Sequence, residues 1–167
     1  MSSDKALPFN SELAAEAGAL LVERGEFLAV AESSAGGFIS ATLLSVPGAS
    51  AFYLGGAVVY TGRSRGLVFE RDALPPETRG ATEDFAQRLA LGARAKMRSE
   101  WGLAETGASG PSGNPYGDPA GHAWVCVARP DGSTATRHLL TGSDDRAANM
   151  VAYTDAAIEL LVAELRS

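Results

Sequence analysis

Helix-like and strand-like segments alternate along the whole chain, and this alternation constrains the fold more than any other feature of the sequence. Apolar residues recur at helical spacing in residues 11–24, and residues 27–31 form a short apolar run of the strand type. The pattern predicts further helices over residues 36–46, 64–69, 82–101 and 144–165, and further strands over residues 54–60, 103–106, 122–128 and 133–140. This order predicts an α/β fold, in which helices cover both faces of a mostly parallel sheet and a hairpin adds one antiparallel strand.

The same order predicts where a ligand would bind. In open sheets of this kind, ligands bind beyond the carboxyl ends of the strands. The loops expected at these ends are residues 32–37, 60–65 and 106–121, with residues 72–80 forming another, proline-containing loop. We therefore expect three loops that are far apart in the sequence to meet at one cleft.

Composition limits the class of protein and its ligands. The chain has 167 residues, of which 46% are hydrophobic and 20% charged, which is typical of one globular domain. We expect a single domain over residues 1–167, with its core at 11–165. The net charge of −6 argues against a nucleic-acid partner. The single cysteine, Cys126, can form neither an internal disulfide nor a thiolate metal site.

The chain also shows no sign of export or membrane insertion. Residues 1–8 lack the apolar core of a targeting signal, and no apolar run reaches the length of a membrane span. We therefore expect a cytoplasmic protein without a membrane partner.

The first of the three loops, AESSAGG at residues 31–37, contains the candidate nucleophile. It leaves an apolar strand and enters a helix through Gly36 and Gly37. A serine here is well placed to attack a carbonyl, while backbone N–H groups near Gly36 would stabilise an oxyanion or bind phosphate. The alternative is a serine that only caps the helix. Glu32 would orient the serine or bond to the backbone.

The other two loops contain a tyrosine and a glycine-rich crossing. In GAVVYTGRSR, residues 56–65, Tyr60 at the end of a strand could donate a hydrogen bond or act as a base; the alternative is an exposed aromatic ring beside solvated arginines. In TGASGPSGN, residues 106–114, the glycines permit a nest of N–H groups for phosphate or carboxylate, although the ending of a P-loop is missing. The alternative is a long surface loop. His122 and His138 lack a partner at ligand spacing, and we expect them to be structural or exposed.

Together with DPAGHAW at residues 118–124 and DDRAANM at 144–150, these segments resemble the pattern of the CinA C-terminal domain family, including its stand-alone nicotinamide-nucleotide amidohydrolases. Order and spacing agree from residue 11 to 165. The resemblance implies a three-layer α/β/α fold with a mixed, mostly parallel sheet, often in a homodimer. It implies hydrolysis of the carboxamide of nicotinamide mononucleotide, a pyridine nucleotide, to nicotinic acid mononucleotide and ammonia, with no metal and no cofactor.

The resemblance also implies site residues. The family nucleophile falls on Ser33, its tyrosine on Tyr60 and its loop threonine on Thr106. The expected substrate-binding residues lie in the first and third loops: Ser34, Gly36, Gly37, Gly107, Ser109, Gly110, Gly113 and Asn114.

The sequence departs from the family pattern at four places, the first of which is Ser34-Ala35 in place of the Cys-Thr that follows the family nucleophile. A family lysine falls on Arg65, a family arginine on Met150 (or on Asn149 in a shifted register), and a second family lysine on Asp118. An arginine stays charged in proteins and cannot accept the serine proton. We therefore expect Tyr60 to act as the base, assisted by Arg65.

Two other functions fit the sequence less well. The departures from the family pattern would also suit a non-catalytic relative that binds a nucleotide or a protein. A protein that acts on DNA itself is suggested only by the competence-related name of the family, and the acidic charge argues against it.

Overall fold

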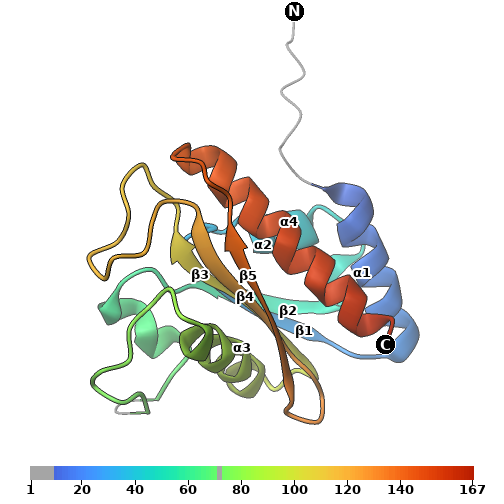
Figure 1. Ribbon diagram of the computed structural model, residues 1–167. Helices are drawn as coiled ribbons and strands as arrows, with labels where there is room; N and C mark the ends of the chain where they lie inside the picture. The colour runs from blue at the N-terminus through green and yellow to red at the C-terminus, as the bar shows by residue number, and fades with distance from the viewer. Residues whose placement is uncertain (1–9, 71–72) are drawn as a thin grey trace, which may run out of the picture.

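The computed structural model describes residues 10–70 and 73–167. Its elements follow the predicted alternation (Figure 1). The helices are α1 (Ser11–Arg24), α2 (Phe38–Leu44), α3 (Glu83–Met97) and α4 (Arg146–Leu165), with short 3-10 helices η1 (Ala49–Ala51) and η2 (Gly62–Leu67). The strands are β1 (Leu28–Glu32), β2 (Tyr53–Val58), β3 (Trp101–Ala108), β4 (His122–Ala128) and β5 (Thr134–Leu140).

The strands form one mixed sheet in the order β2-β1-β3-β4-β5. β1 lies parallel to β2 and β3, and β4 lies antiparallel to β3 and β5, so β4 alone among these strands runs in the opposite direction. Helices α1, α2 and α4 cover one face and α3 covers the other (Figure 1). The prediction of a three-layer α/β/α fold with a mostly parallel sheet is confirmed.

The sheet is held by a hydrophobic core on each face. Consecutive side chains of a strand point to opposite faces, and β1 uses this alternation fully. Leu28 and Val30 pack in the cluster beneath α1, α2 and α4, whereas Ala29 and Ala31 pack in the cluster beneath α3. Because every residue of β1 is buried, the loop that follows this strand starts from a rigid position.

Side-chain caps define the starts of two helices. The Asn10 side chain accepts a hydrogen bond from Leu13 N (3.2 Å) at the start of α1, and the Thr82 hydroxyl accepts one from Phe85 N (3.2 Å) at the start of α3. Such caps satisfy amide groups that have no partner within the helix. They fix where the two helices begin.

The predicted end of α3 is wrong. The helix ends at Met97 rather than at residue 101, because Arg98 takes a left-handed backbone conformation with a φ of 55°. Trp101 instead begins β3, where its N–H donates to Phe27 O (3.0 Å). Pairing with β1 therefore determines the structure of this segment more strongly than its helical spacing does.

Two predictions concern residues that lie outside the described ranges. They concern the absence of a targeting signal in residues 1–8 and the first residue of the predicted loop 72–80. Within residues 10–70 and 73–167, no helix combines the length and apolar character needed to cross a membrane.

Close contact between α3 and β3 makes Gly102 sensitive to substitution. A Cβ atom at Gly102 would overlap the carbonyl oxygen of Ala90, whereas a Cβ at Gly66 would meet open space. We expect Gly102→Ala to lower the free energy of unfolding by about 1–3 kcal/mol, the usual cost of overpacking. Gly66→Ala is the control and should change it by less than about 0.5 kcal/mol. Urea denaturation measures both, and equal effects would contradict this account of the packing.

Candidate active site

Residues of all three predicted loops line one cleft with two lobes. The main lobe, of about 320 Å³, is lined by Ser33, Tyr60, Arg65 and Thr106, among others. The second lobe, of about 250 Å³, is lined by Ser34, Ser109, Gly110, Gly113 and Arg146, among others. Tyr60, Gly107 and Asn114 border both lobes. The convergence of the loops that the strand order predicts is therefore present.

The turn at Ser33 and Ser34 is held by a carboxylate from the neighbouring strand. Glu105 of β3 is fully buried, and one of its oxygens accepts hydrogen bonds from Ser33 N (3.0 Å) and Ala35 N (2.8 Å). Its other oxygen accepts from the Ser34 hydroxyl. The backbone on both sides of Ser34 is thereby fixed against β3.

A second buried carboxylate, Glu32, holds the start of α2. It accepts hydrogen bonds from Gly37 N (2.9 Å), Ile39 N (3.1 Å) and Ser40 N (2.9 Å). Gly36 N donates to Ser33 O (3.1 Å). The prediction that amides at Gly36 are available to an oxyanion or a phosphate is therefore wrong, because acceptors within the protein already occupy them. Of the two roles considered for Glu32, the structure shows bonding to the backbone.

The Tyr60 side chain is hydrogen-bonded to an arginine of α4. Its phenol oxygen accepts a hydrogen bond from Arg146 Nη2 (2.9 Å), and Arg146 Nη1 donates to Gly110 O (2.6 Å). Arg65 instead donates to Thr78 O (2.9 Å), and its Cζ lies 4.8 Å from the centre of the Phe85 ring. The expectation that Arg65 assists Tyr60 is therefore corrected: the guanidinium bonded to Tyr60 belongs to Arg146.

Thr106 and Gly107 form the wall of the cleft at the end of β3. The Thr106 hydroxyl accepts a hydrogen bond from Ala81 N (3.0 Å), which holds a residue with a φ of 58° beside the cleft. A Cβ at Gly107 would lie 2.5 Å from His122 O. Glycine at this position therefore allows the close approach of β4.

The glycine-rich loop is fixed by its own side chains. Ser109 Oγ donates to Ser34 O (3.0 Å), which ties this loop to the serine turn. The Asn114 side-chain oxygen accepts from Tyr116 N (3.0 Å) and Asp118 N (3.1 Å). The side chain of Asn114 thus shapes the loop, and its expected contact with substrate stays a prediction.

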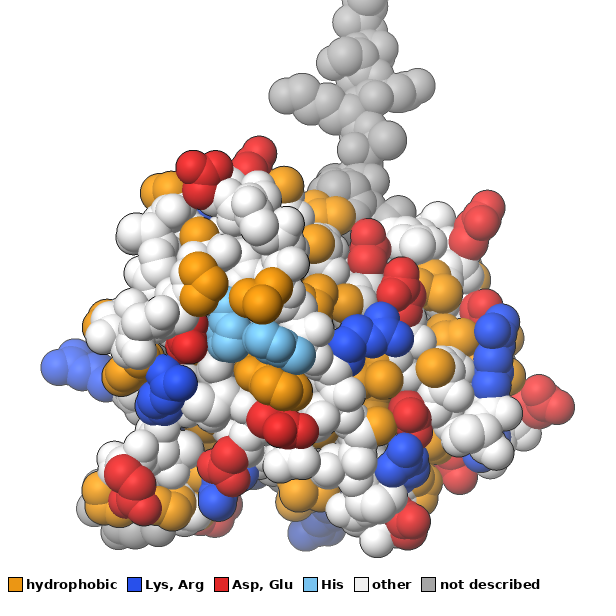
Figure 2. Space-filling model, viewed as in Figure 1, with side chains coloured by type: hydrophobic (Ala, Val, Ile, Leu, Met, Phe, Trp, Pro, Cys, Tyr) orange, Lys and Arg blue, Asp and Glu red, His pale blue; other side chains and the backbone are white. Residues whose placement is uncertain are grey.

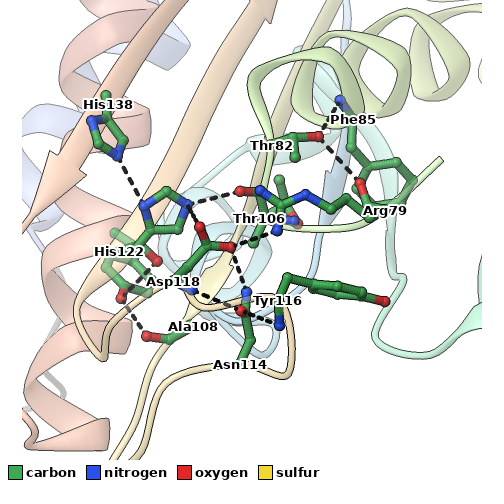
Figure 3. A network of polar contacts seen from close by, with 12 residues as sticks. Arg79, Thr82, Phe85, Thr106, Ala108, Asn114, Tyr116, Asp118, His122 and His138 are labelled. Carbon is green, nitrogen blue, oxygen red and sulfur yellow. Dashed lines mark hydrogen bonds and ion pairs between the residues drawn. The ribbon is translucent and has the colours of Figure 1, made fainter. Parts of the chain in front are cut away.

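Asp118, at the position of a family lysine, belongs to a polar network that includes the cleft residue Asn114 (Figure 3). It pairs with Arg79 (3.1 Å) and accepts from Asn114 Nδ2 (2.7 Å). Desolvation acts in the opposite direction, but the Asn114 hydrogen bond and the charges of His122 and Arg79 together lower the pKa of Asp118. These partners stabilise the charged form of Asp118, and Asp118 in turn fixes the end of the glycine-rich loop.

The two histidines extend this network to the surface. His122 is buried, with Nε2 2.7 Å from Ala81 O and Nδ1 2.9 Å from Nε2 of the exposed His138, which stacks on Trp124. They form one patch beside hydrophobic side chains in Figure 2. The expectation that both histidines are structural or exposed agrees with this arrangement, since His122 is buried and hydrogen-bonded and His138 is exposed.

Sequence reasoning missed Glu105, Arg146 and the role of Asn149. The signal for Glu105 was present, because an acid in the apolar segment that leads into Thr106 requires a buried partner. Asn149 is buried and donates to Ser109 O (2.8 Å). Met150 lies against the serine turn, since a Cβ at Gly36 would be 2.6 Å from its Cε. Neither Asn149 nor Met150 replaces the family arginine as a cation.

Within residues 10–70 and 73–167, no three side chains of His, Cys, Asp or Glu come together as metal ligands would. Hydroxyl groups, Arg65 and Arg146 line the cleft, and the buried Glu32 and Glu105 carboxylates hold the serine turn.

Fold and site together define a class of protein: an α/β/α domain whose first strand ends in a serine turn that faces a glycine-rich loop. A family model described as the CinA C-terminal domain matches residues 10–165. The chain therefore belongs to the CinA family.

Relatives with known sequences and structures agree with this assignment. The chain is 37% identical over 145 residues to a CinA-like protein of Synechocystis sp. (strain ATCC 27184 / PCC 6803 / Kazusa), covering 86% of this chain and 35% of that protein. It is 38% identical over 156 residues to a CinA-like protein of Anaeromyxobacter sp. (strain Fw109-5), covering 93% and 38%. The chain thus spans little more than a third of the length of these relatives.

Solved structures show the same fold. The competence damage-inducible protein A (ComA) of Klebsiella pneumoniae subsp. pneumoniae MGH 78578 superposes with a TM-score of 0.85 at 27% identity, over 95% of this chain and 98% of that chain. The competence/damage inducible protein CihA of Agrobacterium tumefaciens superposes with a TM-score of 0.85 at 27% identity, over 100% of both chains.

The buried Glu105 predicts a pH dependence of stability. Desolvation, opposed by three hydrogen bonds and reinforced by the charge of Glu32, raises the pKa of Glu105 from 4.5 to about 7. Between these values the folded chain keeps a proton that the unfolded chain releases, so this group lowers the free energy of unfolding as pH rises. We expect a loss of about 3 kcal/mol from pH 4.5 to 7 in the wild type relative to Glu105→Gln, measured by urea denaturation. Parallel curves for the two proteins would exclude the shift.

Proposed function

We propose that the chain is a nicotinamide-nucleotide amidohydrolase, which converts the carboxamide of nicotinamide mononucleotide to a carboxylate and releases ammonia. The observation that carries the proposal is the cleft itself, in which the serine turn, Tyr60 and the glycine-rich loop lie together. The resemblance to the CinA family supplies the reaction and the substrate.

The groups in the cleft suit an acyl transfer. A serine hydroxyl of the turn attacks the carboxamide carbon, and the family pattern assigns this role to Ser33, which borders the main lobe. Tyr60 accepts a hydrogen bond from Arg146 through its oxygen, so its own O–H is available to donate to the oxyanion. Arg65 contributes positive charge to the main lobe and cannot accept a proton.

The second lobe suits the charged part of the nucleotide. Arg146 brings a permanent positive charge to it, and Ser109 and Ser112 bring hydroxyl groups. Guanidinium groups bind phosphate through charge-assisted hydrogen bonds. The proposal therefore places the pyridine ring in the main lobe, which the Phe85 and Tyr116 rings border, and the phosphate in the second lobe.

Ammonia release by the purified chain tests the proposal. With nicotinamide mononucleotide as substrate, we expect release that the double variant Ser33→Ala/Ser34→Ala reduces at least about 10²-fold, because it removes both hydroxyls of the turn. Equal release by the two proteins, or none by the wild type, would refute hydrolysis at this turn.

Tyr60→Phe tests the oxyanion contact. Loss of one oxyanion donor typically lowers kcat about 10²–10³-fold, and we expect a change of this size with KM nearly unchanged. Tyr116→Phe is the matched control, because Tyr116 is also an exposed tyrosine at the cleft. Its effect on kcat should be less than about threefold, the change expected when no transition-state contact is lost. Equal effects of the two variants would remove Tyr60 from the mechanism.

A second candidate function is nucleotide binding without hydrolysis. It is favoured by Arg65, which replaces the family lysine and is held between Thr78 O and the Phe85 ring. Calorimetry with nicotinamide mononucleotide distinguishes the two functions, since binding heat without ammonia would support this one. Action on DNA has less support, because on the face in Figure 2 the Lys and Arg side chains are interspersed with Asp and Glu.

A further inference from the structure

We propose that Ser34 and Glu105 form the nucleophile–base pair of this site, so that the attacking hydroxyl lies one residue beyond the position that the family pattern assigns. For its reaction, this inference rests on the proposed amidohydrolase function. It concerns two residues whose contact no sequence motif of the chain predicts.

The side chains of Ser34 and Glu105 are in direct contact. The Ser34 hydroxyl donates to Glu105 Oε1, and both side chains are buried. The other carboxylate oxygen is engaged by Ser33 N and Ala35 N, so the oxygen that faces Ser34 is fixed in direction. The Ser33 hydroxyl, in contrast, makes no hydrogen bond to any residue in the part of the chain that the structure describes.

Glu105 has the properties of a proton acceptor for a serine nucleophile. A serine nucleophile needs a proton acceptor, and the position of the family lysine holds Arg65, which stays protonated. Glu105 forms no ion pair within residues 10–70 and 73–167, and the ionisable groups that act on it are Glu32 and Tyr153. Desolvation raises its pKa to about 7. A base with a pKa near the operating pH is the most effective.

Ser34 can be reached by a substrate from the second lobe of the cleft. Ser34 borders the second lobe together with Tyr60 and Arg146. Ser109 Oγ donates to Ser34 O (3.0 Å) and fixes the residue from the side of the glycine-rich loop. Tyr60 borders both lobes, so a carboxamide placed where the lobes join, with its ring in the main lobe, would meet Ser34, the Tyr60 hydroxyl and the positive charge of Arg146 together.

The reaction balances with these groups and one water molecule. Ser34 Oγ bonds to the carboxamide carbon while its proton passes to Glu105 Oε1. The carbon–nitrogen bond then breaks, and the amide nitrogen takes that proton and leaves as ammonia. Water attacks the resulting ester and gives a proton to Glu105. The bond between the carbon and Ser34 Oγ breaks, Ser34 recovers the proton, and the carboxylic acid is released.

Covalent labelling tests the pair without depending on the substrate. The chain is treated with a small sulfonyl fluoride, which reacts with activated serine hydroxyls, and the adduct is located by mass spectrometry. We expect the adduct on Ser34, formed at least about 10²-fold more slowly in Glu105→Gln. Glutamine keeps an oxygen for the amides of Ser33 and Ala35 but cannot accept the Ser34 proton. Ser133→Ala, which changes an exposed serine in the turn between β4 and β5, should be labelled at the wild-type rate.

The outcomes separate this inference from the proposed function. An adduct on Ser33, no adduct on either serine, or an undiminished rate in Glu105→Gln would overturn the pair. If Ser33 is labelled and ammonia is still released, the amidohydrolase function stands without the pair. If Ser34 is labelled and nicotinamide mononucleotide is not hydrolysed, the pair stands and the assigned substrate is wrong. Far-ultraviolet circular dichroism of Glu105→Gln, and labelling of Ser34→Ala as a folded negative control, exclude misfolding as the cause.

Discussion

The hydrogen bonds from the serine turn to the Glu105 carboxylate are the interaction on which the rest of the site depends. One buried side chain of β3 accepts from Ser33 N, Ala35 N and the Ser34 hydroxyl. Burying a carboxylate is costly unless hydrogen bonds compensate it. The raised pKa of Glu105 indicates that compensation is incomplete without a cation. Glu105 can therefore take up or release a proton near neutral pH, and it does so in direct contact with the Ser34 hydroxyl.

The sheet topology explains how this interaction forms. β1 and β3 are parallel neighbours, with Ala31 opposite Ala104, so the carboxyl ends of the two strands lie side by side. The serine turn follows β1, and Glu105 is the next residue of β3. Glu32 holds the other side of the turn by capping α2. The two carboxylates leave this turn little freedom, and Ser33 and Ser34 are thereby held at the edges of the two cleft lobes.

The fold and the position of the cleft could be predicted because the signals for them are local. Apolar spacing and glycines place the elements, and strand order then brings the loops at Ser33, Tyr60 and Thr106 together. The contacts within the cleft could not be predicted in the same way. Glu105 meets Ser34 across 71 residues of sequence and Arg146 meets Tyr60 across 86. The error at Gly36 has a different cause. The acceptors of Gly36 N and Gly37 N are Ser33 O and the Glu32 carboxylate, which are close in sequence, but the sequence does not show how the turn orients them.

Glu105 is a buried, hydrogen-bonded carboxyl group whose pKa burial raises to about 7. Its side-chain carboxyl ¹³C chemical shift, followed by NMR as pH is raised, measures this most directly. The account predicts a midpoint near the pKa of about 7, with the amide signals of Ser33 and Ala35 moving at the same pH. A midpoint near the ordinary value of 4.5, with those amide signals unchanged through neutral pH, would contradict it.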